Sequence, residues 1–149
     1  MNTCETIESV ETNRLEAVTV ANENIVHLPL GLLGFESIKR YALLQNTNET
    51  PFRWLQVIDQ PDLAFLVLPA LEIFPDYEPD VPAEDVKFLG LNHPDDALVF
   101  NIVTLAAKGS ATANLKGPIV INRFTLKGKQ VVLANAARYS IQHPLPLSR

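Results

Sequence analysis

The most informative stretch of the chain is ANLKGPIVIN, residues 113–122. Its Gly117-Pro118 pair predicts a turn or a strand entry, because proline has no amide hydrogen to donate and glycine tolerates positive φ. The IVI run that follows is apolar and β-branched, which is typical of a strand packed on both faces or covered by a neighbouring loop. Asn114 and Asn122 mark its polar ends. The stretch therefore predicts a tight connection that leads into a buried β-strand.

Short apolar segments separated by turn residues recur along the rest of the chain, and each predicts a strand. The expected strands are residues 14–20, 25–28, 41–45, 52–58, 63–68, 98–107, 117–121, 124–126 and 130–134, with a hairpin turn at Lys127-Gly128. Residues 142–149, with two prolines, are expected to run extended over the surface. Eight or more short strands predict an all-β, mainly antiparallel fold, either a barrel or a sandwich. We expect a small, single-domain, β-barrel-like structure with at most one or two short helices.

Residues 72–85, called the acidic segment below, carry six acidic residues, with prolines at positions 75, 79 and 82. The prolines exclude a central strand, so an exposed loop is expected. Asp80 is expected to cap a short helix that has Pro82 near its first turn and ends by Gly90.

Length and composition are typical of one domain. The chain has 149 residues, of which 47% are hydrophobic, and no apolar run approaches the roughly 20 residues of a membrane-spanning helix. Residues 1–13 are expected to form a flexible acidic leader, and residues 14–149 a single β domain. The leader has no apolar core of a signal peptide, which favours the cytoplasm. Cys4 is the single cysteine, so no internal disulfide is possible.

Several functional classes are not expected. Residues 97–149 contain only basic charges, but these are widely spaced and the net charge of the chain is −5, so direct nucleic-acid binding is not expected. His27, His93 and His143 lack partners at metal-ligand spacing, and no metal or cofactor is expected. No nucleophile with a recognisable base is present, so an enzyme is not expected.

Taken in order, several segments resemble the FliW family, small cytoplasmic flagellar assembly factors of bacteria. The resemblance rests on GLLGFE at 31–36, PF at 51–52, LQ at 55–56, PDLAF at 61–65, IVT at 102–104, the stretch 113–122, GKQV at 128–131 and YSIQHPL at 139–145. Leu33 stands where the family often has proline. Any one segment alone would be weak support, but the ordered set covers about 115 positions, and such a set is difficult to match by chance.

The resemblance implies a regulator that binds proteins and is not an enzyme. FliW-like proteins bind flagellin and the translational repressor CsrA, an RNA-binding dimer, so that the two partners compete for one regulator. A monomer when free, without nucleic-acid or membrane contacts, is expected. The alternative is a β-barrel module that binds a carbohydrate or small ligand, although one tryptophan and three tyrosines are few for sugar stacking. A hydrolase is the third possibility.

One candidate binding surface is expected for CsrA and two are expected for flagellin. For CsrA, acidic side chains would steer and rings would anchor the partner, and the candidates are Glu72, Phe74, Asp76, Tyr77, Glu78 and Asp80. The alternative there is a solvated loop whose two rings turn inward. For flagellin, an apolar surface near Phe35, or one beside Asn114, would shield its amphipathic helices.

Overall fold

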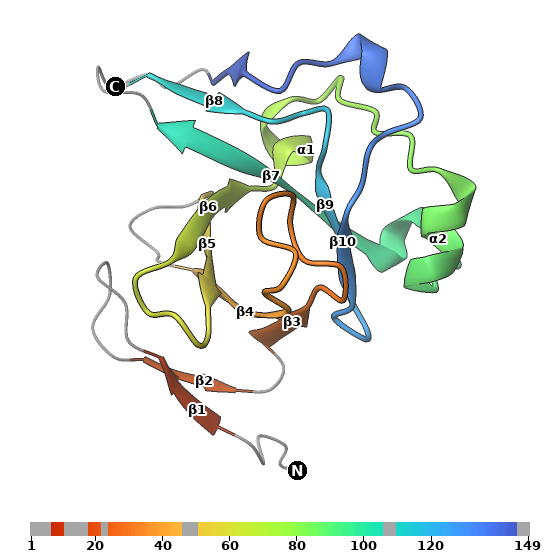
Figure 1. Cartoon of the computed structure of the whole chain (residues 1–149). Helices are drawn as coiled ribbons and strands as arrows, with labels where there is room; N and C mark the ends of the chain where they lie inside the picture. Colours follow the sequence, from red (N-terminus) through yellow and green to blue (C-terminus); the bar gives the residue numbers. More distant parts are fainter. Residues whose placement is uncertain (1–6, 11–17, 22–23, 46–50, 106–109, 146–149) are drawn as a thin grey trace.

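A computed structural model describes residues 7–10, 18–21, 24–45, 51–105 and 110–145 of the chain (Figure 1). Its elements, in chain order, are β1 (Ile7–Val10), β2 (Val18–Ala21), β3 (Ile25–His27), β4 (Arg40–Gln45), β5 (Arg53–Val57), β6 (Ala64–Leu68), α1 (Ala70–Ile73), α2 (Ala83–Leu89), η3 (Pro94–Asp96), β7 (Ala97–Leu105), β8 (Ala111–Ala113), β9 (Ile119–Asn122), β10 (Gly128–Gln130), η4 (Ala136–Arg138) and β11 (His143–Pro144). Strand β1 lies in the expected leader and pairs with β2, which follows the leader, and the other residues of the leader lie outside the described residues. The expected strand at residues 14–20 is described only from residue 18, and the expected extended tail, which contains β11, only to residue 145.

The main sheet follows the order β10-β9-β7-β6-β5-β4-β3, and β8 pairs with both β7 and β11. Every strand ladder is antiparallel. The two ends of the sheet meet at an isolated bridge, where the His27 amide donates to the Leu126 carbonyl oxygen (2.9 Å). A single bridge is not a ladder, so the sheet, within the described residues, is curved but not closed into a barrel. The predicted all-β, mainly antiparallel class is confirmed.

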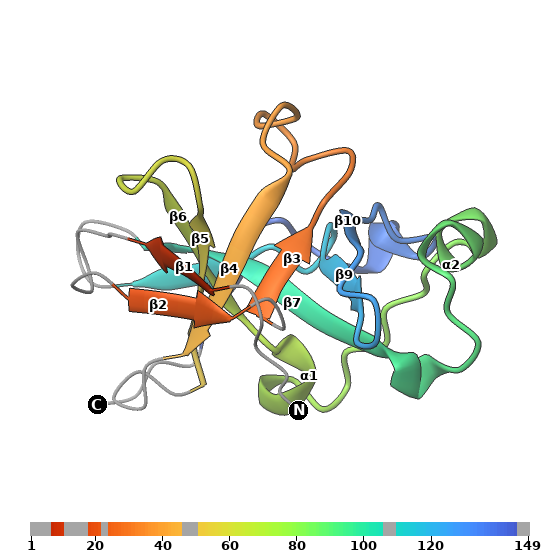
Figure 2. The same cartoon turned by 90° about the horizontal axis from the view of Figure 1, so that it is seen from below.

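The long strand β7 crosses the molecule (Figure 2) and pairs in turn with β9, β6 and β8. Its first part pairs with β9, with Ala97 opposite Asn122, its middle with β6, and its last part with β8, with Val103 opposite Ala113. The chain from β8 to β9 therefore runs back along β7, and residues 114–118 bulge out between these two strands.

The bulge is a side-chain-capped turn. The Asn114 Oδ1 atom accepts hydrogen bonds from the backbone amides of Lys116 (3.0 Å) and Gly117 (2.9 Å), which is the turn chemistry that asparagine favours. All four residues of β9 are buried. Both parts of the prediction for this stretch, a tight connection and a buried strand, are confirmed.

Alternating residues of β7 face two apolar cores, as the two-residue period of a strand requires. Val99 and Val103 pack in a core with Tyr77 and Leu89, whereas Phe100 packs in the core enclosed by β3 to β6. The central strands are thus covered on both faces. The acidic segment, α2 and the C-terminal chain cover the first core.

The predicted hairpin turn at Lys127-Gly128 and the strand predicted at residues 124–126 are wrong. The turn lies at residues 123–126, because the Asn122 Oδ1 atom accepts hydrogen bonds from the amides of Phe124 (2.8 Å) and Thr125 (3.2 Å). Gly128 is instead the first residue of β10. A Cβ atom there would lie 2.7 Å from Leu28 Cδ2, so glycine is needed for close packing.

Two other boundaries differ from the prediction. Helix α2 has no side-chain cap, because Pro82 occupies its N-cap position and Asp80 lies two residues earlier, where its amide donates to Asn135 Oδ1 (3.1 Å). The predicted end of the helix is confirmed, since Gly90 closes it at φ 71°. The strand predicted at residues 130–134 ends at Gln130, since the chain beyond bonds to loops, with the Ala134 amide donating to the Asp80 carbonyl oxygen (2.8 Å).

Candidate functional site

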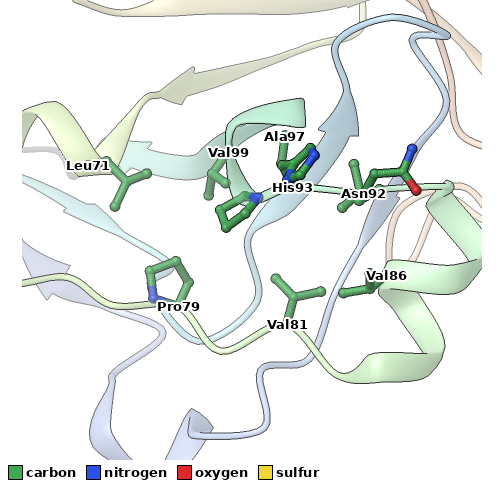
Figure 3. A pocket seen from close by; sticks show the side chains of 10 residues that line it. Leu71, Pro79, Val81, Val86, Asn92, His93, Ala97 and Val99 are labelled. Carbon is green, nitrogen blue, oxygen red and sulfur yellow. The ribbon is translucent and has the colours of Figure 1, made fainter.

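The acidic segment runs between two hollows. On one side is a cleft of about 420 Å³, called the apolar cleft, whose walls include Leu71, Val81, Val86 and Val99 (Figure 3). On the other side is a groove of about 610 Å³, called the aromatic groove. It is lined by Phe74, Pro75, Asp76, Tyr77, Leu115, Arg138, Tyr139, Ser140 and His143. The segment therefore contributes a wall to both.

Four of the candidate carboxylates lie on the surface, and the backbone that carries them is fixed. Glu72, Asp76, Glu78 and Asp80 are all exposed. The side-chain amide of Asn135 holds two of these residues, because its Nδ2 donates to the Glu78 carbonyl oxygen (2.8 Å) while its Oδ1 accepts from the Asp80 amide. The Glu78 amide in turn donates to the Tyr139 hydroxyl oxygen (2.9 Å). The segment thus presents its charges from a positioned backbone.

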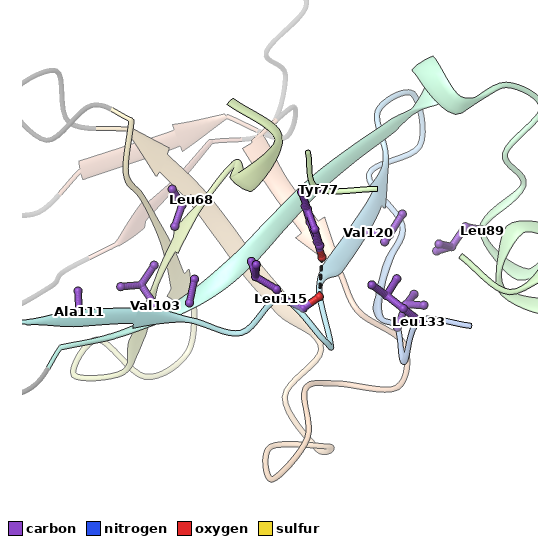
Figure 4. Close-up of a cluster of buried hydrophobic side chains, with 10 residues drawn as sticks. Leu68, Tyr77, Leu89, Val103, Ala111, Leu115, Val120 and Leu133 are labelled. Atoms are coloured by element: carbon purple, nitrogen blue, oxygen red, sulfur yellow. Dashed lines mark hydrogen bonds between the residues drawn. The ribbon is translucent and has the colours of Figure 1, made fainter. Parts of the chain in front are cut away.

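Tyr77 points inward from this segment. Its side chain is only 4% exposed, and its hydroxyl donates to the Leu115 carbonyl oxygen (2.7 Å) (Figure 4). The same hydroxyl oxygen accepts from Asn101 Nδ2 (3.1 Å), which also donates to the Asn114 carbonyl oxygen (2.8 Å). Burial raises the pKa of Tyr77 to about 12, although the hydrogen bond from Asn101 acts in the opposite direction.

Phe74 is half-buried and lies in the wall of the aromatic groove. Its ring meets His143 edge to face, with ring centroids 4.7 Å apart, and the Tyr77 and Tyr139 rings form a second such pair at 4.9 Å. The two rings of the acidic segment are therefore packed against the C-terminal chain. Arg138 approaches Glu78 at 3.8 Å, but both side chains are largely exposed, so this ion pair adds little stability.

Phe35 lies on a different surface. It packs edge to face on Phe65 of β6, with ring centroids 5.1 Å apart, and is 37% exposed. Leu30 and Leu33, which are 52% and 73% exposed, lie in the same turns between β3 and β4, and the three exposed apolar residues are called the leucine patch.

The leucine patch is joined to the 114–118 bulge by one side chain. Gln130 Oε1 accepts from the Leu33 amide (2.9 Å), and its Nε2 donates to the Gly117 carbonyl oxygen (3.2 Å). The two places expected separately as flagellin sites are thus linked. Tyr77 links the acidic segment to the same bulge.

Sequence reasoning missed the side chains that make these links, namely Asn101, Asn135, Tyr139 and Gln130. A signal existed for Asn101, because an amide within the apolar run of β7 must find hydrogen-bond partners when buried. Asn101 is fully buried, and its Oδ1 has no partner among the described residues. Gln130 and Tyr139 lie in two of the segments that carry the family resemblance, GKQV and YSIQHPL, but nothing local in these segments or around Asn135 indicates their contacts.

By fold and surface, the chain is a small antiparallel β domain that displays an acidic segment beside two hollows. Within the described residues, no helix is long and apolar enough to cross a membrane. Residues 9–145 match the family described as FliW protein. The chain belongs to the FliW family of flagellar assembly factors, a non-enzymatic family.

Relatives and a solved structure agree with this assignment. The flagellar assembly factor FliW of Geobacter sulfurreducens is 39% identical over 137 residues, which cover 91% of this chain and 85% of that protein. The one from Treponema denticola is also 39% identical over 137 residues, covering 91% and 92%. The one from Natranaerobius thermophilus is 37% identical over 130 residues, covering 86% and 85%. A crystal structure of the flagellar assembly factor FliW superposes with a TM-score of 0.82 at 33% identity, covering 92% of this chain and 96% of the other.

Proposed function

We propose that this flagellar assembly factor is a cytoplasmic regulator, monomeric when free, that binds flagellin and antagonises the RNA-binding repressor CsrA by partner switching. When flagellin is secreted, the released protein captures CsrA and relieves repression of flagellin translation. When flagellin accumulates, it reoccupies the regulator. Family membership supports the role in flagellar assembly, and the surfaces of this chain suggest where the two partners bind.

The acidic segment is the proposed CsrA surface. The observation that carries this proposal is the set of exposed carboxylates on a backbone held by Asn135 and Tyr139. CsrA must present basic surface to bind RNA, so an acidic face accelerates its approach even when it docks outside the RNA site. Tyr77 acts from inside by holding the segment, and Phe74 acts through the wall of the aromatic groove.

The leucine patch and the adjoining bulge at Asn114 form the proposed flagellin surface. Amphipathic segments bind apolar surface with their apolar face, and the exposed leucines supply such surface. Because Asn114 caps the bulge, its role in this surface is to shape it.

Reversal of one charge tests the CsrA surface. Asp76→Lys is expected to weaken CsrA binding about tenfold, mainly through slower association, and to reduce the dependence of the association rate on salt. Phe74→Ala should instead speed dissociation. Asp59→Lys is the matched control, because Asp59 is an exposed carboxylate in the turn between β5 and β6. A folded Asp76→Lys variant with the affinity and salt dependence of the control would rule out this surface.

A further inference from the structure

The apolar cleft is a site that the proposed partner surfaces leave unused. Its walls come from α1, the acidic segment, α2 and the start of β7, and the side chains of Leu71, Val81 and Val86 point toward the hollow (Figure 3). At about 420 Å³ it falls within the range of roughly 300–1,000 Å³ that is typical of ligand sites. Its lining contains no charged residue, and Asn92 and His93 are its polar members.

Exposed carboxylates lie close in the chain to four of the lining residues, and these carboxylates are called the acidic rim. Glu72 follows Leu71, Asp80 precedes Val81, Glu84 lies two positions before Val86 in the first turn of α2, and Asp95 follows Pro94. Among the described residues, none of these four side chains forms an ion pair.

Basic groups near this rim are fewer. Lys87 is exposed on α2, and Arg123 donates through Nε to the Asp95 carbonyl oxygen (2.7 Å). An apolar hollow within a mainly acidic rim favours an occupant that is apolar at its centre and basic at its flanks. An acidic or purely apolar ligand would gain nothing from the rim.

We propose that the apolar cleft binds one large apolar side chain of a partner protein segment, with lysine or arginine residues on both sides that meet the acidic rim. The inference extends the proposed function, because it adds a second apolar contact, besides Phe74, to the acidic segment that steers the partner. The cleft supplies the slow dissociation and the rim the fast association.

The test uses a fluorescein-labelled synthetic peptide in which one leucine is flanked on each side by a glycine and two lysines. Binding to the full chain is followed by fluorescence anisotropy. Replacement of the peptide leucine by serine is expected to weaken binding at least tenfold, since a buried leucine contributes about 1.5–3 kcal/mol. Replacement of the lysines by glutamates should abolish binding.

Variants of the protein locate the bound peptide. Leu71→Asn is expected to weaken binding of the leucine peptide about three- to tenfold, and it should not harm folding, because Leu71 is 48% exposed. Leu105→Asn is the matched control, because Leu105 is 63% exposed at the other end of β7. Asp80→Asn should reduce the salt dependence of binding.

Three results would overturn the proposal: equal binding of the leucine and serine peptides, equal effects of Leu71→Asn and Leu105→Asn, or a dimer of the chain that Leu71→Asn dissociates. The last result would assign the cleft to a second copy. CsrA and flagellin binding are measured separately on the same variants. If the chain binds the peptide but neither CsrA nor flagellin, the proposed function is wrong. If it binds both proteins but not the peptide, the proposed apolar anchor is wrong.

Discussion

The hydroxyl group of Tyr77 donates a hydrogen bond to the carbonyl oxygen of Leu115, 2.7 Å away, and so ties the acidic segment to the bulge between β8 and β9. These residues are 38 positions apart in the sequence. Because the bond is buried, neither group can exchange its partner for water, and the link depends on the single hydroxyl.

Removal of this hydroxyl should therefore destabilise the protein. Tyr77→Phe leaves the Leu115 carbonyl oxygen without a donor and removes one acceptor from Asn101, so we expect a loss of about 1–3 kcal/mol in unfolding free energy. Urea unfolding followed by circular dichroism measures it. Tyr139→Phe is the comparison, since its hydroxyl accepts one bond from an exposed amide and its loss should cost less. Equal losses in the two variants would contradict the assigned role.

Alkaline pH should weaken the fold through the same residue. Burial raises the pKa values of Tyr77 and Tyr41 to about 12, whereas a tyrosine in the unfolded chain has a value of about 10. Their contribution to stability is therefore complete below pH ~10 and is lost as the pH rises towards about 12. Each contributes on the order of 2–3 kcal/mol. In urea titrations between pH 8 and 11, the unfolding free energy of Tyr77→Phe should fall less steeply with pH than that of the wild type. Identical slopes would be evidence against a role of Tyr77 in this pH dependence.

Two glycines should respond in opposite ways to the same substitution. Gly128→Ala places a Cβ atom against Leu28 and Ile121 in the core, and we expect a loss of about 1–3 kcal/mol. Gly117→Ala meets only ordinary contacts from 3.5 Å outward, without positive φ, so its effect should lie between neutral and about 1 kcal/mol stabilising. Thermal unfolding of both variants makes the comparison. A Gly128→Ala variant as stable as Gly117→Ala would disprove the close packing at β10.

Substitution in the leucine patch should weaken flagellin binding. Leu33→Asn removes exposed apolar surface but keeps the amide that bonds Gln130, so we expect binding to fall about three- to tenfold without loss of stability. Phe35→Ala should have a larger effect and also cost some stability, because its ring packs on Phe65. Phe124→Ala, at a residue 73% exposed in the turn before β10, is the control for flagellin affinity measured by calorimetry. Undiminished binding in Leu33→Asn would place flagellin elsewhere.

The sequence predicted the buried strand β9 because an apolar β-branched run has few alternatives between Gly117-Pro118 and a polar end. The predictions for residues 124–128, a few positions later, were wrong. Phe124 and Leu126 suggest a strand by their apolar side chains, but the Asn122 side chain caps a turn there and Leu126 adopts φ 61°. A glycine such as Gly128 is usually interpreted as a turn residue. Here glycine is needed because Leu28 packs too closely for a Cβ atom, and no local sequence pattern indicates that contact.

In the candidate site, too, local patterns were predicted from the sequence and long-range contacts were not. Prolines and carboxylates predict an exposed acidic loop from local chemistry, and its four candidate carboxylates are indeed exposed. The direction of the Tyr77 ring depends on Asn101 and Leu115, which are distant in sequence, so pattern alone could not assign it. The partner roles of these residues stay predictions.

Because the Gln130 side chain makes two hydrogen bonds, a fluorescent dye near one of its partners can report a movement of the other. Its amide holds the Leu33 backbone on one side and the Gly117 carbonyl oxygen on the other, so a displacement of either loop strains both. A dye attached at position 33, which is open to solvent, would then change its signal when a ligand moves residues 114–118. After Cys4→Ser, one cysteine introduced at that position would serve as a real-time sensor of events at the bulge.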